Sequence, residues 1–181
     1  MDPADIRIRP ARPEDLAVIR ALTPRLAAFG GLTTRDPEAV VASVTALLED
    51  ALERATAGGA PASPAGGERA GEGAVAGPVR PGVHVFIAES PTGEALGCVQ
   101  VQVAMEFFSG EPEAYVGALM VSEVAEGRGV GRALMQTAEG WARERGLRRL
   151  SLEVFAGNAR ARAFYQKLGF EEDSLRLVRE W

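Results

Sequence analysis

Three glycines at alternate positions, Gly127, Gly129 and Gly131, have the residue type and the spacing of an anion-binding turn. Each lacks a Cβ that would hold a ligand away from the backbone amides. Apolar residues then recur at intervals of four, four and three between Val130 and Trp141, which predicts one face of a helix. The turn would therefore open a helix, where unpaired N–H groups and the positive end of the helix dipole favour a phosphate.

The residues around this turn fit two common kinds of phosphate site poorly. A nucleotide triphosphatase loop requires Lys-Ser or Lys-Thr after the last glycine, but Arg132 and Ala133 stand there. A dinucleotide fingerprint requires a third glycine, where the chain has Leu134, and an acidic residue further on, where Glu153 falls inside the next predicted strand. Two interpretations remain. The turn binds a pyrophosphate or phosphate ligand of another kind, or it is a tight connection that binds no ligand.

Two other reactive residue types occur once each. His84 lies in a predicted strand, and we expect a packed or surface residue rather than a catalytic one. Cys98 lies in an apolar strand pattern, where we expect a small core residue. A single cysteine excludes a disulfide within one chain and indicates a reducing compartment. We therefore expect a cytoplasmic protein, and we expect no metal site.

Composition and charge fit one globular domain over residues 1–181, with 46% hydrophobic and 25% charged residues. The formal net charge of −5 argues against non-specific binding to nucleic acid or to an anionic membrane, and it fits a cationic partner better. No apolar run is long enough to span a bilayer, and the N-terminus has no hydrophobic signal core.

Residues 55–82 interrupt this globular composition with 8 glycines and 4 prolines among 28 residues. Such a non-periodic excess is typical of low complexity. Hardly any large apolar side chain is present to offset the entropy lost on ordering the segment. We interpret it as a flexible insertion within one domain, because residues 1–54 hold only one short strand and could not build a sheet alone.

The remaining chain alternates strands and helices, which predicts an α/β fold with a mixed sheet. A strand at residues 6–9 precedes a helix that Pro24 should kink or split, and Asp36 caps a second helix. The later elements are a hairpin of strands at 83–89 and 95–104, an acidic loop at 106–113, a buried strand at 115–121, the helix from the glycine turn to Gly146, a strand at 149–155, a helix from Asn158 to Gly169, and an edge strand at 170–181.

Two segments resemble the signature motifs of the GNAT superfamily of acyl-CoA-dependent N-acyltransferases. They are RGVGRAL at residues 128–134 and NARARAFYQKLGF at residues 158–170, and the second is the more telling because it is long and correctly placed after the turn. The resemblance covers residues 1–54 and 83–181. It implies the GNAT fold, in which a central mixed sheet is splayed at the cofactor and helices cover both faces.

The resemblance also implies acetyl-CoA as co-substrate. In this family the end of the strand at 115–121 pairs with the pantetheine arm, and the amides of the glycine turn hold the pyrophosphate. Tyr165 would lie near the cofactor sulfur as general acid, a role that suits a phenol protonated at neutral pH. From spacing alone, Tyr165 is an aromatic residue on a helix core face. The implied cofactor-binding residues are Leu119, Met120, Val121, Gly127, Arg128, Gly129, Val130, Gly131, Arg132 and Asn158.

The chain departs from the family at two places. The family often has Gln or Arg where this chain has Glu126, and we expect that carboxylate to face solvent. Many members place a general-base carboxylate near Gly117, but residues 115–121 contain none. Glu153 matches a position that some members use as base, and strand alternation allows it to reach the splay between the strands. A carboxylate tied into a structural hydrogen bond is the alternative.

We therefore expect an N-acetyltransferase that transfers the acetyl group directly to a primary amine, with a backbone amide near Met120 polarising the thioester carbonyl. Three carboxylates before the strand at 115–121, those of Glu106, Glu111 and Glu113, favour a small cationic amine as acceptor. The alternatives are a catalytically silent acyl-CoA sensor and an enzyme that acts on protein N-termini or lysines. The expected partner is a small molecule, and a homodimer is compatible with the sequence.

The insertion generates the first testable prediction. Replacing residues 56–79 with a short Gly-Ser loop should change the free energy of unfolding by about 1 kcal/mol or less, because loop-closure entropy varies slowly with length. Thermal unfolding of the two proteins would measure this. A collapse of the transition in the shortened chain would show instead that the segment packs on the core.

Overall fold

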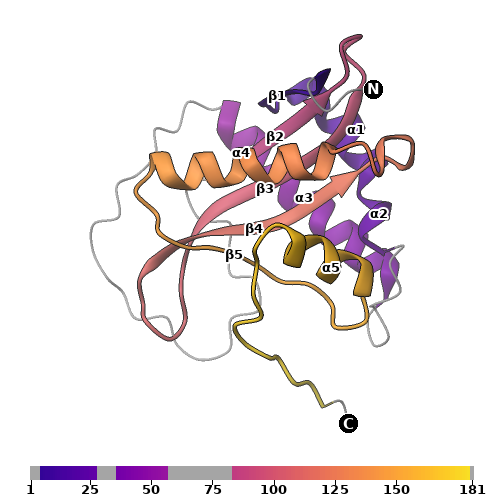
Figure 1. The fold of residues 1–181 in the computed structure, drawn as a ribbon. Coiled ribbons are helices and arrows are strands. Elements are labelled where there is room, and N and C mark those ends of the chain that lie inside the picture. The colour runs from indigo at the N-terminus through magenta and orange to yellow at the C-terminus, as the bar shows by residue number, and fades with distance from the viewer. Residues whose placement is uncertain (1–4, 28–35, 57–82, 180–181) are drawn as a thin grey trace.

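The fold is built on a five-stranded sheet with the strand order β1-β2-β3-β4-β5 (Figure 1). The computed structural model describes residues 5–27, 36–56 and 83–179, so most of the predicted insertion lies outside the described residues. All neighbouring strands are antiparallel except β4 and β5, which are parallel. The expected mixed sheet is therefore present. The strands are β1 (Arg7–Pro10), β2 (His84–Glu89), β3 (Ala95–Met105), β4 (Pro112–Val121) and β5 (Leu150–Leu152).

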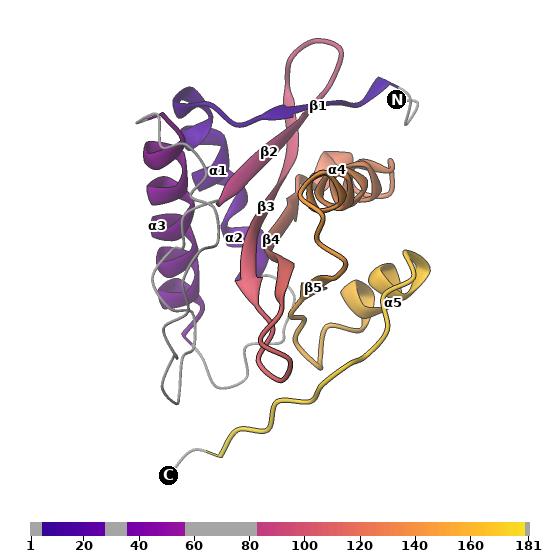
Figure 2. The same ribbon diagram turned by 90° about the vertical axis from the view of Figure 1, so that its left-hand side faces the viewer.

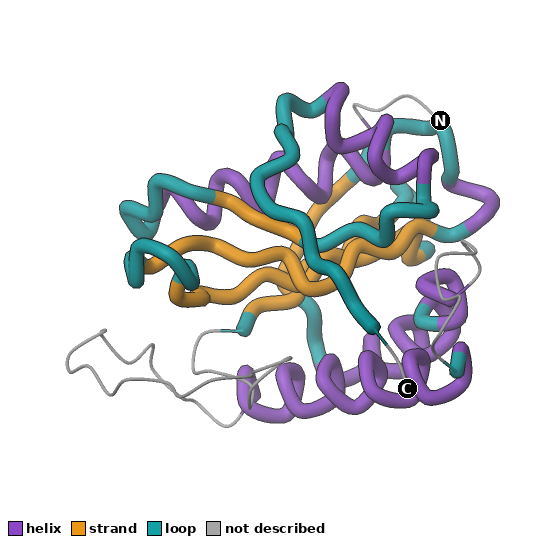
Figure 3. Tube along the Cα trace, turned by 90° about the horizontal axis from the view of Figure 1, so that it is seen from below, coloured by secondary structure: helices purple, strands orange, loops and turns teal. Residues whose placement is uncertain are grey.

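Helices cover both faces of the sheet, and the three layers are visible in Figures 2 and 3. The helices α1 (Leu16–Leu22), α2 (Pro24–Ala27) and α3 (Pro37–Thr56) lie on one face, and α4 (Val130–Glu144) and α5 (Ala159–Lys167) lie on the other. Two 3₁₀ turns, η2 (Pro13–Asp15) and η3 (Glu123–Ala125), connect elements. Each helix layer buries its own apolar cluster against one side of the strands.

Several predicted boundaries are confirmed. Pro24 splits the first helix into α1 and α2, because proline has no N–H to continue the hydrogen-bond ladder. Asp36 caps α3 through its side-chain oxygen Oδ1, which accepts the Glu38 N–H at 3.1 Å. Gly146, with φ of +71°, follows the end of α4. The predicted apolar positions of α4, Val130, Leu134, Ala138 and Trp141, are all buried.

A β-bulge interrupts the ladder between β3 and β4. Gln100 pairs with Ala118 but Val101 pairs with Val116, so Gly117 is the extra residue. A Cβ on Gly117 would lie 2.0 Å from Gln100 Oε1, so a side chain there would displace the Gln100 amide. The bulge also shifts the alternation of β4, because Val116 and Leu119 both pack toward α4 although they are three positions apart.

The strands β4 and β5 pair over only three positions, from Ala114↔Leu150 to Val116↔Leu152. Beyond them β4 continues to Val121, while β5 ends. The predicted strand at 149–155 is thus shorter than expected. The expected splay is present, and it begins where Gly117 and Glu153 follow the last paired residues.

The acidic loop predicted at 106–113 is shorter than expected, because β3 extends to Met105 and β4 begins at Pro112. Glu113 lies inside β4 opposite Ala104 and is buried. Its carboxylate accepts a hydrogen bond from Arg149 Nε at 3.3 Å. An arginine partner therefore allows this acidic residue to lie within a strand.

The edge strand predicted at 170–181 is wrong for the described residues, because the chain from 170 to 179 forms no strand and runs away from the body of the protein (Figures 1 and 2). Two ion pairs bind the start of this segment. Arg149 binds Asp173 at 2.6 Å, and Arg162 of α5 binds Glu172. The short β5 also offers few backbone groups for a sixth strand to pair with.

None of the helices in the described part of the chain is both long and apolar enough to span a membrane.

A partly buried ion-pair cluster joins β1, β2 and the start of α1. Arg9 binds both carboxylate oxygens of Asp15, at 2.6 and 2.8 Å, and binds Glu89 at 2.5 Å. The Asp15 side chain is 7% exposed and also accepts the Arg12 N–H at 2.7 Å. The hydrogen bond from Arg9 is the main cause that lowers the pKa of Asp15.

This cluster predicts how stability depends on pH. Asp15→Asn should cost about 2 to 3 kcal/mol at pH 7, because it leaves Arg9 partly unpaired in a buried site. Since the folded-state pKa lies below the ordinary value of 3.8, the carboxylate stabilises the fold above that value, and its contribution is lost as the pH falls through the folded-state pKa.

Urea unfolding of both proteins between pH 7 and pH 2 would measure the difference, with Glu14→Gln as an exposed control. A gap between the parent and Asp15→Asn that stays constant down to the lowest pH would contradict the role of the Asp15 charge.

Candidate functional site

The glycine turn connects the end of β4 to α4 in the conformation that glycine favours. Gly127 and Gly129 have φ of +72° and +84°, in the left-handed region, and Gly129 caps α4. Gly131 allows close packing instead, because a Cβ there would lie 3.2 Å from Cζ of Phe164 on α5. The three glycines therefore shape the backbone at the α4 N-terminus and bring α5 against it.

The amides of this turn are largely available. Among the described residues, no acceptor is found for the N–H groups of Gly127, Gly129, Val130, Gly131 and Arg132. The Arg128 N–H differs from the others, because it donates to the Ala125 carbonyl at 3.3 Å. Five of the six predicted amides thus remain free to donate to a ligand. A cluster of free amides at a helix N-terminus suits an anion such as a diphosphate.

The edge of β4 that faces away from β3 has no strand partner beyond Val116 in the described part of the chain. The Ser122 N–H donates to the Leu96 carbonyl at 2.9 Å, which fixes the alternation of the β3–β4 ladder. By this alternation the backbone of Met120 also faces β3. The N–H and C=O groups of Leu119 and Val121 face the open edge, so they are better placed than those of Met120 to bind an extended ligand.

Tyr165 lies on α5, where its ring contacts Phe164 and Phe170 with centroid distances of 5.1 and 5.7 Å. Burial raises the pKa of Tyr165 to about 12. The hydroxyl is therefore protonated at neutral pH and can act as a proton donor.

Asn158 begins α5, and its side-chain oxygen accepts the Ala161 N–H at 3.0 Å. This oxygen forms the cap. The amide nitrogen of the side chain, and the second lone pair of the oxygen, are left to contact a cofactor.

Glu153 is exposed at the fork between β4 and β5. Its charge affects the pKa of Tyr115, a residue that received no role from the sequence. The pKa of Tyr115 is raised to about 12, first by burial and then by the charges of Glu153 and Glu113. Tyr115 pairs with Ser151 one position before the last pair of β4 and β5, so a second protonated phenol lies on the strand close to where the strands separate. The signal in the sequence was the one hydroxyl of an otherwise apolar strand.

Gln100 is a second residue that sequence reasoning missed. Its side chain is 1% exposed and lies against the bulge at Gly117. Its nitrogen Nε2 donates to Gln102 Oε1 at 3.2 Å, whereas its oxygen Oε1 has no partner among the described residues. Two glutamines at alternate positions of an apolar strand were the available signal. The amide fills the space that a larger side chain at position 117 would occupy.

The carboxylates of Glu106, Glu111 and Glu113, at the hairpin between β3 and β4, are not equivalent. Glu106 accepts the N–H groups of Phe108 and Ser109 at 3.0 and 2.6 Å, and these bonds lower its pKa to about 2. Glu113 is buried and bound by Arg149. Glu111 is exposed. The first two carboxylates are therefore occupied by the protein itself, which weakens the argument that all three attract a cationic acceptor.

The expectation that Glu126 faces solvent is wrong. Its carboxylate binds Arg25 of α2 and Arg160 of α5. Two guanidinium groups within reach of one carboxylate outweigh its hydration, so the side chain turns toward the protein.

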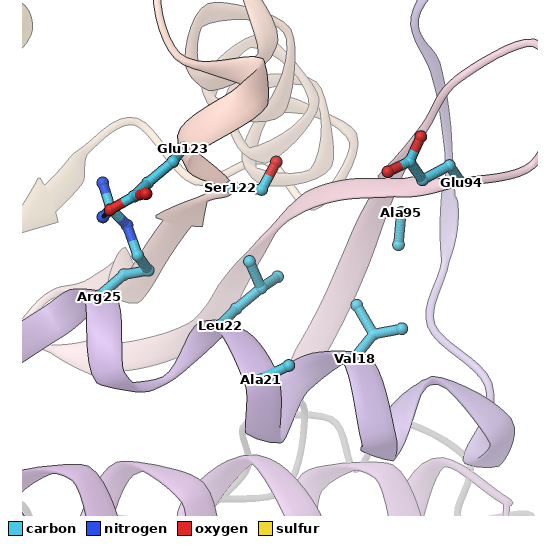
Figure 4. A pocket seen from close by; sticks show the side chains of 8 residues that line it. All are labelled: Val18, Ala21, Leu22, Arg25, Glu94, Ala95, Ser122 and Glu123. Carbon is cyan, nitrogen blue, oxygen red and sulfur yellow. Dashed lines mark hydrogen bonds and ion pairs between the residues drawn. The ribbon is translucent and has the colours of Figure 1, made fainter.

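A hollow of about 430 Å³ lies between α1, α2 and the adjoining ends of β3 and β4 (Figure 4). Its walls are apolar on α1, at Val18 and Leu22, while Arg25 and Glu123 lie together at one end. The hollow borders the loop before the glycine turn from the α1 side. It is thus separate from the open edge of β4, which faces β5.

His84 and Cys98, each the only residue of its type, both pack against other side chains of the fold. His84 packs on Trp141 with a centroid distance of 5.2 Å, and partial burial lowers its pKa. Cys98 is buried in the core, as predicted, and burial raises the pKa of its thiol to about 12. No group of three or more His, Cys, Asp or Glu side chains suited to a metal is found in residues 5–27, 36–56 and 83–179.

Comparison with known proteins identifies a family that the chain matches. The family model described as the Acetyltransferase (GNAT) family matches residues 67–170, which is more than half of the chain. An aminoglycoside N(6')-acetyltransferase type 1 from Stenotrophomonas maltophilia is 33% identical over 91 residues, covering 49% of this chain and 60% of that protein. A mycothiol acetyltransferase from Saccharomonospora viridis is 37% identical over 89 residues, covering 48% and 29%. The chain thus spans less than two thirds of either relative.

Solved structures agree on the fold along nearly the whole chain. A putative acetyl transferase from Pyrococcus furiosus has a TM-score of 0.68 at 22% identity and covers 97% of this chain and 99% of its own. An aminoglycoside N-acetyltransferase in complex with CoA has a TM-score of 0.64 at 19% identity and covers 97% and 94%. At such identities the likeness concerns the fold alone.

Proposed function

The chain belongs to the Acetyltransferase (GNAT) family, and from this membership we propose that it transfers the acetyl group of acetyl-CoA to a primary amine. One observation carries the proposal most directly. Five free amides at the N-terminus of α4 follow, after the short turn η3, a strand whose outer edge is unpaired, so one extended ligand with a diphosphate could bind both. Acetyl-CoA is such a ligand.

The residues at the site fit this co-substrate. The amides of Gly127, Gly129, Val130, Gly131 and Arg132 would hold the diphosphate. The backbone of Leu119 and Val121 would pair with the amides of the pantetheine arm, as a strand would. When bound, acetyl-CoA supplies the activated acetyl thioester.

Three groups of the protein would then act on the reaction. An outward N–H of β4, from Leu119 or Val121, would donate to the thioester carbonyl oxygen as charge develops there. Tyr165 would donate its phenolic proton to the departing sulfur. Glu153, at the fork, would accept the proton that the attacking amine loses, either directly or through a water molecule.

For the acceptor we propose a small cationic amine. The support comes from the formal net charge of −5, from Glu153 at the fork and from Glu111 on the exposed hairpin. Two relatives carry the name aminoglycoside N(6')-acetyltransferase, and aminoglycosides are a class of polyamine.

A silent acyl-CoA sensor remains a second candidate, because residues 115–121 of β4 contain no carboxylate. Mass spectrometry separates the two. The protein is incubated with acetyl-CoA and a panel of polyamines, aminoglycosides and lysine-containing peptides. Acetylated small amines support the proposal, acetylated peptides favour a protein acetyltransferase, and binding of CoA without any turnover favours the sensor.

Tyr165→Phe tests the general acid. The ring keeps its contacts with Phe164 and Phe170, so folding and CoA affinity should survive while kcat falls about 10²- to 10⁴-fold. Steady-state kinetics and a parallel CoA binding titration would measure the two effects. Turnover within about threefold of the parent, with chemistry rate-limiting, would mean that water or another group supplies the proton.

Glu153→Gln tests the base. Because the amide cannot accept a proton, kcat/KM at neutral pH should fall about 10²-fold or more. Glu14→Gln is the control, since it removes an exposed carboxylate in the 3₁₀ turn η2, outside the proposed site. The two variants should differ clearly in their pH–rate profiles. Equal activities would remove Glu153 from the mechanism.

A further inference from the structure

Glu126 lies at the boundary between the two helix layers, immediately before the glycine turn. Its oxygen Oε1 binds Nη2 of Arg25 on α2, and its oxygen Oε2 binds Nη2 of Arg160 on α5 at 2.5 Å. Since α2 and α5 lie on opposite faces of the sheet, the carboxylate bridges the two layers at the end of β4 (Figure 2). We refer to Arg25, Glu126 and Arg160 as the Glu126 bridge.

The side chains of the two arginines in the Glu126 bridge differ in exposure and in their number of carboxylate partners. The side chain of Arg25 is 18% exposed and also binds Glu123 (Figure 4), so it is held in place whether or not Glu126 is ionised. The side chain of Arg160 is 65% exposed, while that of Glu126 is 24% exposed. An exposed arginine with a single carboxylate partner can exchange that partner for another anion at little cost. Arg160 is therefore the mobile member of the bridge.

The charge of Glu126 works against a phosphate ligand. The hydrogen bond from Arg160 is the main cause that lowers the pKa of Glu126, so this group is ionised at neutral pH. The residue directly precedes Gly127, the first of the free amides. An anion on these amides would lie beside a negative charge, and it would compete with that charge for the guanidinium group of Arg160.

We propose that Glu126 is a built-in competitor of the cofactor phosphates: it occupies Arg160 while the turn is empty and yields it when a diphosphate binds. The bridge would then set the CoA affinity below the value that the amides and arginines alone would give. Arg160 would be a phosphate ligand in the bound state, and Arg25 would keep Glu126 at the rim of the turn. This inference rests on the proposed function, because that function identifies the phosphate ligand as CoA.

Calorimetric titration of the full chain tests the proposal. Three probes, CoA, 3'-dephospho-CoA and pantetheine, distinguish the diphosphate from the 3'-phosphate and from the phosphate-free arm. Glu126→Gln should bind CoA about three- to tenfold more tightly than the parent, because it releases a guanidinium group and removes a like charge. Pantetheine should bind both proteins equally. If 3'-dephospho-CoA shows the same gain as CoA, the diphosphate is the competing group.

Two further variants sharpen the result. Arg160→Gln should bind CoA about three- to tenfold more weakly, and Glu126→Gln should gain less affinity in that background. Glu172→Gln is the matched control, because it removes a carboxylate of equal charge that binds Arg162 on the same helix, outside the bridge. This control should leave CoA affinity unchanged. Thermal unfolding of each variant shows whether it is folded.

The outcomes separate the inference from the proposed function. If the parent binds CoA and Glu126→Gln binds it no more tightly, the competitor role is overturned while the proposed function stands. A gain shared by Glu172→Gln would reduce the effect to net charge and overturn the role as well. Inorganic pyrophosphate serves as a cofactor-free probe: tighter pyrophosphate binding by Glu126→Gln, in a chain that binds no CoA, would support the bridge and reject the proposed function.

Discussion

The arrangement of the site depends on the brief pairing of β4 with β5, which lasts for three positions. A strand inside a sheet normally saturates its backbone groups on both sides. Here the outer edge of β4 is left open after Val116, while its inner edge remains bound to β3 as far as Val121. The sheet thus offers a row of unsatisfied peptide groups in the middle of the molecule, without losing the rigidity that β3 gives to the strand. An extended substrate arm can use that row in place of a missing strand.

The neighbouring features serve this opening. The bulge at Gly117 changes which side chains of β4 face each helix layer at the point where the strands separate. The glycine turn then leaves five amides without an acceptor in the segment that follows β4. The helix α5 carries Tyr165 on the same face of the sheet as α4, and Gly131 lets Phe164 of α5 pack closely against α4. The bridge through Glu126 ties both helix layers to this end of the strand.

Much of this could be predicted from the sequence, because local rules determine it. Apolar periodicity identified α4, Pro24 divided the first helix, and the motif around Asn158 located α5. Several of the errors involve long-range charge pairing. Glu113 lies in a strand with Arg149 within reach, the segment from residue 170 forms ion pairs with Arg149 and Arg162 and no strand, and Glu126 meets arginines 101 and 34 positions away. No local pattern encodes which distant arginine a carboxylate will meet.

The environment of Cys98 has a practical consequence. The chain has one cysteine, its thiol is 1% exposed, and its pKa is raised to about 12. Because the thiolate is the reactive form, we expect this residue to react slowly with alkylating dyes in the folded protein. A cysteine introduced at an exposed position, such as Ser109 on the β3–β4 hairpin, would be labelled alone without removal of the native one. The natural sequence is therefore ready for fluorescence and spin-label experiments that follow movement of the hairpin or of α5.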